Sequence, residues 1–267
     1  KSATGTVTVT VTAVNHAPTI AQIANSASDE DSVFSVNFTV GDVETPAASL
    51  VVFATSANQT LVRDANIAVG GTGATRSLAV VPEANRSGAT TITVTVRDPE
   101  QAAAQMSFVL TVNAVNDAPV LSVPAAQNLF EDGTLVLSHS NGNQISVADL
   151  DAALNPVRLT LAVTHGKLTF DRIAGLSFVS GVNGSASLTV EGPMDLLNND
   201  LSGSLSYQPE ANFNGTDTLS VTVDDRGNTG SGGAKTAGST VTLNVAAVND
   251  APSFSKGPDQ TVRKNSG

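Results

Sequence analysis

Several residue types on which other classes of protein depend are missing from this sequence. It contains no cysteine and no tryptophan, one tyrosine, and 13 lysines and arginines against 24 aspartates and glutamates. The absence of cysteine excludes disulfides, thiolate metal sites and cysteine nucleophiles. The net charge of −11 repels phosphate backbones and anionic membrane surfaces. We therefore expect no nucleic-acid partner, and cations are the natural partners of such a surface.

Long apolar runs are absent as well. No stretch reaches the length of a membrane span, so we expect no membrane insertion. A leader sequence is not visible either, because Lys1 opens directly into a strand-like pattern. These features predict a segment of a longer secreted chain.

The residues that are present favour β-structure. Apolar residues make up 40% of the 267 residues and charged residues 14%, which allows two domains with their own cores. Threonine and valine are abundant, and β-branched side chains favour the pleated, half-buried surface of a sheet. Helical periodicity is weak, apart from a short helix predicted to start at Pro193–Leu197. The composition predicts an all-β protein.

A six-residue motif occurs three times and marks a repeat. Ala13–Pro18 recurs as Ala114–Pro119 and as Ala247–Pro252, with proline-to-proline separations of 101 and 133 residues. Each copy follows a segment in which apolar and polar residues alternate, which predicts a strand with one buried face. The three predicted strands are Thr6–Thr12, Met106–Asn113 and Thr240–Val245.

A second pair of matching segments fixes the boundaries of the repeats. Pro82–Asp98 corresponds to Pro209–Asp225 over 17 positions at a constant offset of 127. We assign residues 1–15 to the last strand of a preceding repeat, 16–116 to a complete repeat, 117–249 to a longer repeat, and 250–267 to the start of another. Part of the extra length is Gly227–Gly238, which predicts a flexible surface loop. Repeats of about 100 residues with many short strands predict Greek-key β-sandwiches of about seven strands.

Acidic residues recur at equivalent places in the two complete repeats. The pairs are Glu30-Asp31 with Glu131-Asp132, Asp42 and Glu44 with Asp149 and Asp151, Asp98 and Glu100 with Asp224 and Asp225, and the linker Asn116-Asp117 with Asn249-Asp250. Calcium takes about six to eight oxygen ligands, which no single segment here supplies. Several loops together would supply them, so the pattern predicts Ca²⁺ sites. The alternative is that these are solvated turn residues, since aspartate and asparagine favour turns.

The linker Val115–Pro119 resembles the inter-domain motif of cadherins, and the early glutamate and the Asp-x-Asp/Glu pairs resemble cadherin ligands. The whole pattern resembles more closely the cadherin-like tandem repeats of large bacterial surface adhesins. The segments that carry this resemblance are Phe130–Thr134, Thr164–Leu168 and Ala211–Asp217. The resemblance covers nearly the whole chain. It implies tandem cadherin/immunoglobulin-like β-sandwiches outside the cell or on its surface, with Ca²⁺ at the repeat junctions.

The resemblance also implies particular ligands, carried over by position. At the central junction it implies Glu30, Asp98, Glu100, Asn116, Asp117, Asp149 and Asp151. At the next junction it implies Glu131, Asp224, Asp225, Asn249 and Asp250. At the first junction His16 replaces the linker aspartate, which leaves Asp42 and Glu44 with a weaker set. Lys264 stands where the early glutamate of the third repeat would lie, so its far junction departs from the pattern too.

Three functional classes follow from these observations. A calcium-stiffened spacer or adhesion module, whose partners are the neighbouring repeats of its own chain, agrees with every signal. A module that binds a cell-surface glycan or protein is the alternative, although glycan-binding modules usually present aromatic platforms and Tyr207 is the one tyrosine. The isolated histidines His16, His139 and His165 form no readable catalytic grouping, so we expect no enzymatic activity.

Overall fold

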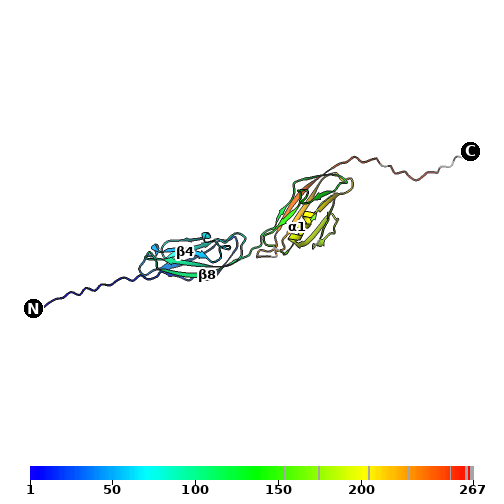
Figure 1. Cartoon of the computed structure of the whole chain (residues 1–267). Helices are drawn as coiled ribbons and strands as arrows, with labels where there is room; N and C mark the ends of the chain where they lie inside the picture. Colours follow the sequence, from blue (N-terminus) through cyan, green and yellow to red (C-terminus); the bar gives the residue numbers. More distant parts are fainter. Residues whose placement is uncertain are drawn as a thin grey trace. The chain divides into compact units, whose positions relative to one another are not determined.

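The computed structural model describes residues 1–152, 154–173, 175–203, 205–227, 229–252, 254–261 and 264. Strands dominate these residues, and the chain divides into two compact units (Figure 1). The first unit comprises Lys1–Asp117 and Arg226–Lys235, and the second comprises Ala118–Asp225 and Thr236–Gly267. Figure 1 labels β4 and β8 in the first unit and α1 in the second.

The first unit is a sandwich of two four-stranded sheets, with the strand orders β1-β3-β6-β5 and β2-β8-β7-β4. Its strands are β1 (Thr19–Ile20), β2 (Ser26–Asp29), β3 (Phe34–Gly41), β4 (Val51–Ser56), β5 (Ile67–Gly70), β6 (Thr75–Val80), β7 (Gly88–Arg97) and β8 (Ala103–Asn113). Two short 3₁₀ helices, η1 (Ala47–Ser49) and η2 (Asp64–Asn66), lie in the connections.

The core of this sandwich follows from the alternation in its strands. Ile92 and Val94 from β7 and Leu110 from β8 point inward and are fully buried, whereas Thr93, between the first two, lies on the opposite face and is half-buried. Leu78 and Val80 of the opposite sheet pack in the same cluster. The period of two in the sequence therefore places one face of each sheet in the core.

The second unit is larger. Its sheets have the orders β10-β19-β18-β13-β16-β15, β11-β17-β14 and β12-β9. The strands are β9 (Val120–Ser122), β10 (Gln127–Phe130), β11 (Leu135–Leu137), β12 (Ser146–Ala148), β13 (Pro156–Ala162), β14 (Gly166–Phe170), β15 (Ser177–Ser180), β16 (Ser187–Pro193), β17 (Leu205–Pro209), β18 (Gly215–Asp224) and β19 (Thr236–Ala246).

The helix predicted near Pro193 is confirmed as α1 (Met194–Gly203), which begins directly after this proline. Leu197 and Leu201 are one helical turn apart and both enter the core. In the part of the chain that the structure describes, no helix is long and apolar enough to span a membrane.

The prediction of an all-β sandwich is confirmed. The strands predicted over Met106–Asn113 and Thr240–Val245 are confirmed too, since they lie within β8 and β19. The strand predicted over Thr6–Thr12 is wrong for this structure. Residues 1–18 form no strand, and Val7, Val9 and Val11 are 86%, 79% and 88% exposed. Among the described residues no strand pairs with this segment, and a lone strand leaves its backbone hydrogen bonds and its apolar face without partners.

Candidate functional site

The acidic residues of the first unit lie at both ends of one hairpin. The strands β7 and β8 pair from Gly88 to Arg97, and the hairpin closes just after them, where the N–H of Asp98 donates to the carbonyl of Ala102 at 3.0 Å. Asp98 is buried and accepts a hydrogen bond from Nδ2 of Asn15 at 2.7 Å. The hairpin turn is thus the end that meets the first linker.

Glu30 lies at the other end of that hairpin. Its N–H donates to the carbonyl of Asn113, the last residue of β8, and its Oε1 accepts the N–H of Val115 at 2.7 Å. Because β2 pairs with β8 in parallel, the residue that follows β2 lies beside the linker that follows β8. Glu30 therefore holds the outgoing linker, whereas Asp98 contacts the incoming one.

These placements correct the ligand grouping predicted for the central junction. Asp98 and Glu100 do not join Glu30 and Asn116, because ten residues of β7 separate the two ends of the hairpin. Instead Glu100, Glu44 and Asn15 line one hollow of about 300 Å³ at the first linker.

The second unit shows the same division, so the grouping at the next junction is corrected as well. Asp224 lies opposite Thr236 in the β18–β19 pair, at the far end from Gly215. Asp225 follows it and is buried. Glu131 lies at the other end, where its Oε1 accepts the N–H of Val248 at 2.6 Å. Sequence spacing gave the position of each acid along its strand, but not the linker that it meets.

Glu30 and Glu131 share an environment in the two repeats. They are 4% and 5% exposed, and each accepts the N–H of the valine that precedes the linker asparagine. In the second unit Asn214 also donates its Nδ2 to Oε2 of Glu131 at 3.1 Å. The predicted ligands Asn249 and Asp250 remain exposed beyond this point.

Asp42 occupies a tight turn at the end of β3. Gly41, the residue before it, pairs with Thr19, which directly follows the motif proline. Oδ1 of Asp42 accepts the N–H of Glu44 at 2.9 Å and that of Thr45 at 2.8 Å. The bond from Thr45 is the main cause that holds the pKa of Asp42 below its ordinary value, so the side chain is ionised at neutral pH.

Asp149 has the same geometry in the second unit. Ala148 pairs with Val120, which also directly follows a motif proline. Oδ1 of Asp149 accepts the N–H groups of Asp151 and Ala152, both at 2.8 Å. The sequence predicted that these acids occupy equivalent positions in the two repeats, and both aspartates lie in the same kind of turn.

The second oxygen of each turn aspartate distinguishes these positions. Within the described residues, Oδ2 of Asp42 and Oδ2 of Asp149 are buried and have no hydrogen-bond partner. A buried carboxylate oxygen without a partner is costly, and a cation removes that cost. Among the described residues, however, no three histidine, aspartate or glutamate side chains converge on one point. Further oxygens would have to come from asparagine side chains, backbone carbonyls or water.

His16 enters the first linker as a competing partner. Its Nδ1 contacts Oε1 of Glu44, and its N–H donates to Oε2 of the same side chain at 3.3 Å. The residue that replaces the linker aspartate therefore engages one of the two acids expected to bind a metal there.

The linker residue Asn116 is 1% exposed because the segment Arg226–Lys235 covers it. The N–H of Asn116 donates to the carbonyl of Ser231 at 2.8 Å, and Ser231 donates back to Ala114 at 3.0 Å. Nδ2 of Asn116 also donates to the carbonyl of Gly233 at 3.0 Å. The glycine-rich segment that the sequence predicts as a flexible loop is therefore paired with backbone.

Asp217 is a buried acid whose role sequence reasoning missed. It accepts the hydroxyl of Tyr207 at 2.9 Å and the N–H groups of Thr164 and His165 at 3.0 and 2.9 Å. Burial alone would raise the pKa of Asp217, but these backbone donors and that of Thr218 lower it overall. Its place in the Asn-Gly-Thr-Asp segment and the single tyrosine were the available signals. Its contacts make it a structural residue.

Comparison with known proteins gives one family match and a set of similar solved structures. Residues 116–245 match the model of a family described as Bacterial Ig domain. Similar solved structures include the titin domains z1z2 in complex with telethonin, with 14% identity, 89% of this chain and 100% of that chain covered, and a TM-score of 0.31. The structure of DIP-gamma IG1+IG2 is similar with 13% identity, 87% of this chain and 99% of that chain covered, and a TM-score of 0.36. No curated protein matches.

The family match supports an immunoglobulin-like repeat over residues 116–245. Bacterial immunoglobulin-like domains are generally non-catalytic, and they are typically extracellular or on the cell surface. This class is consistent with a surface or extender module.

Proposed function

We propose that this chain is a non-catalytic extender module of a bacterial surface adhesin, and that Ca²⁺ binds at the linker ends of its sandwiches. The carrying observation is the buried Oδ2 of Asp42 and of Asp149, at equivalent positions, neither of which has a hydrogen-bond partner in the described part of the chain. A single buried oxygen without a partner could be a local irregularity of one turn. Two such oxygens at equivalent positions of a sequence repeat indicate that both turns bind the same kind of ligand.

The surrounding donors suit calcium in kind. Around the first linker the oxygens belong to Asn15, Asp42, Glu44, Asp98 and Glu100. Calcium binds carboxylate, amide and carbonyl oxygens in flexible geometry, whereas no cysteine is present for softer metals. The equivalent acids of the second unit are Asp149, Asp151, Asp224 and Asp225, and the resemblance adds the linker pairs Asn116-Asp117 and Asn249-Asp250. Bound Ca²⁺ would supply positive charge that fixes these side chains and the linkers beside them.

Calcium titration of the chelator-treated chain tests this proposal. Asp149→Asn keeps an oxygen to accept the N–H bonds of the turn but removes the charge, so it should weaken calcium binding about tenfold. Asp64→Asn is the matched control, because Asp64, at the start of η2, also accepts a backbone N–H, from Ser56 at 2.7 Å, and is not among the predicted ligands. Its affinity for calcium should equal that of the parent chain. Equal affinity in all three proteins, or no binding at all, would refute the metal assignment.

Stiffening is tested separately by small-angle scattering with and without chelator. If Ca²⁺ immobilises the linkers, its removal broadens the distribution of end-to-end distances, and adding Ca²⁺ back restores it. If the titration shows calcium binding but the distribution of end-to-end distances is the same with and without chelator, the ion acts only locally. That result would refute the stiffening function.

A further inference from the structure

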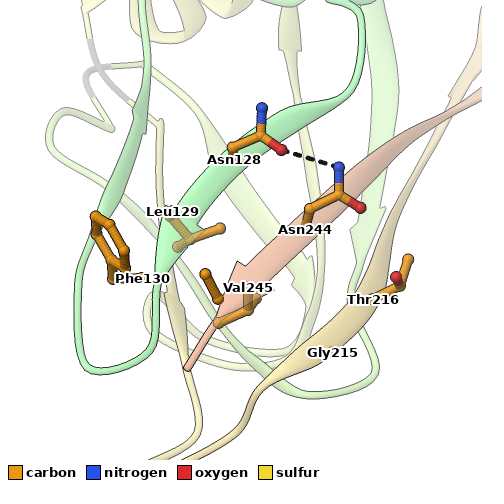
Figure 2. Close-up of a pocket in the computed structure, with 8 residues that line it drawn as sticks. Asn128, Leu129, Phe130, Gly215, Thr216, Asn244 and Val245 are labelled. Atoms are coloured by element: carbon orange, nitrogen blue, oxygen red, sulfur yellow. Dashed lines mark hydrogen bonds between the residues drawn. The ribbon is translucent and has the colours of Figure 1, made fainter. Parts of the chain in front are cut away.

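The second unit carries a pocket of about 470 Å³ on the outer face of its six-stranded sheet (Figure 2). It lies at the β10 edge, over β10, β19 and β18. Exposed residues of these strands line the pocket together with Leu129 and Val245, whose side chains also pack against the core. Because all of these strands belong to one unit, the pocket is complete within it.

Three polar side chains form a row across the pocket. Asn128 lies opposite Asn244, and Asn244 lies opposite Thr216, so the three side chains are neighbours on one face. Nδ2 of Asn244 donates to Oδ1 of Asn128 at 3.0 Å, as Figure 2 shows. This bond uses the oxygen of Asn128 and one N–H of Asn244, so the NH₂ group of Asn128 and the carbonyl oxygen of Asn244 remain available at opposite ends of the pair (Figure 2).

Phe130 provides an apolar platform next to this row. It lies two residues beyond Asn128, about 7 Å along the strand on the same face, and it is 65% exposed. Gly215 and Ala246 leave space in the pocket, since neither carries a large side chain. Among the described residues that line the pocket none is charged, although the chain carries a net charge of −11.

The equivalent face of the first unit lacks these features. Asp29 stands in the place of the exposed ring, and Nδ2 of Asn113 donates to its Oδ1 at 3.1 Å. Ala27 and Ala89 replace the outer two members of the polar row. The pocket is therefore a property of the longer repeat and is not required by the sandwich itself.

We propose that this pocket binds a neutral saccharide. The C–H face of a sugar ring would stack on Phe130, and hydroxyls of the saccharide would pair with the NH₂ group of Asn128 and with the carbonyl oxygen of Asn244. The uncharged lining disfavours both anionic and cationic ligands. This proposal goes beyond the calcium-dependent extender role and does not depend on it, because none of the described lining residues carries a carboxylate.

The test is ligand-observed NMR of the whole chain with a panel of neutral oligosaccharides, namely cellotetraose, xylotetraose, mannotetraose and maltotetraose. Polygalacturonate is the charged comparison. We expect at least one neutral member to bind at millimolar or lower concentration, equally well in Ca²⁺ and in chelator. Phe130→Ala should weaken that binding about tenfold, since it removes the stacking surface.

Two control variants distinguish binding in this pocket from non-specific binding to the chain. Phe254→Ala removes an aromatic ring that is 90% exposed elsewhere in the chain, and Asp29→Ala changes the equivalent position of the first unit. Both should leave binding unchanged. The proposal is overturned if no panel member binds, or if Phe130→Ala binds as well as the parent. Self-association that Phe130→Ala abolishes would overturn it too, because the pocket would then be an interface between copies of the chain.

Discussion

Two buried aspartates of the second unit differ in how their oxygens are satisfied. Asp217 accepts a hydroxyl and three backbone N–H groups. Asp200 lies on the buried side of α1, and within the described residues neither of its side-chain oxygens has a hydrogen-bond partner. Since an ionised carboxylate needs donors, we expect opposite effects of these two residues on stability.

Asp217→Ala should destabilise the second unit by about 3 kcal/mol, because it leaves the Tyr207 hydroxyl and buried N–H groups without their acceptor. Tyr207→Phe removes one hydrogen bond and leaves Asp217 its backbone donors, so it should cost about 1 kcal/mol. Calorimetric unfolding of the three chains measures the difference. Equal losses in both variants would contradict the assignment of Asp217 as the centre of this network.

The dependence of the unfolding free energy on pH, at acid pH, tests whether the pKa of Asp200 is raised in the folded state. Burial raises its pKa, and nearby Arg172 offsets part of that rise. The folded state therefore holds the proton to higher pH than the unfolded chain, so its contribution to stability is full at acid pH and is lost as pH rises through the folded pKa.

Asp200→Asn removes this titration. The stability of the variant relative to the parent should increase as the pH is raised from about 4 to 7. Denaturation curves across this range, compared between the two chains, measure the effect. A difference that is constant with pH would show that Asp200 has the same pKa in both states.

At the scale of elements, the glycine-rich segment depends on close backbone approach. A Cβ on Gly230 would lie 2.6 Å from the backbone nitrogen of Asn116, and the φ of this glycine is +79°. Gly230→Ala should therefore break the pairing of Ser231 with the linker. Hydrogen exchange of the Asn116 amide should accelerate about tenfold or more, as expected when a protected amide opens locally.

Gly233→Ala is the matched control for this prediction. Gly233 has a φ of +73°, but a Cβ there would meet nothing within 4 Å. The control shares the backbone cost of positive φ, about 1 kcal/mol, without the clash. If both variants expose Asn116 equally, backbone strain and not close approach governs the segment.

The sequence predicted those elements whose signal is local. The alternation in Met106–Asn113 and Thr240–Val245 identified two strands, and Pro193 marked the start of α1. The linker met by each acid was not predictable, because it depends on β2 pairing in parallel with a strand more than 80 residues away. The network of Asp217 was missed for the same reason, since its backbone partners lie 52 and 53 residues distant.

At the scale of the whole molecule, the calcium proposal predicts a dependence of unfolding on free ion. A ligand that binds only the folded state at about 100 times its dissociation constant stabilises that state by about 2.7 kcal/mol. For domains of this size the unfolding midpoint should rise by about 10 °C. Tyr207 is the one tyrosine and there is no tryptophan, so tyrosine fluorescence follows the second unit alone. A midpoint that is the same in Ca²⁺ and in chelator would count against the proposal.

The parallel pairing of β2 with β8 has a mechanical consequence. After the short strand β1, the chain enters β2, and it leaves the sandwich directly after β8; four residue pairs join β2 and β8. When the two ends of the chain are pulled apart, the strands are drawn in opposite directions along a common axis. The hydrogen bonds between them are then loaded together in shear and cannot open one at a time, so each such sandwich resists a tensile load across its whole seam.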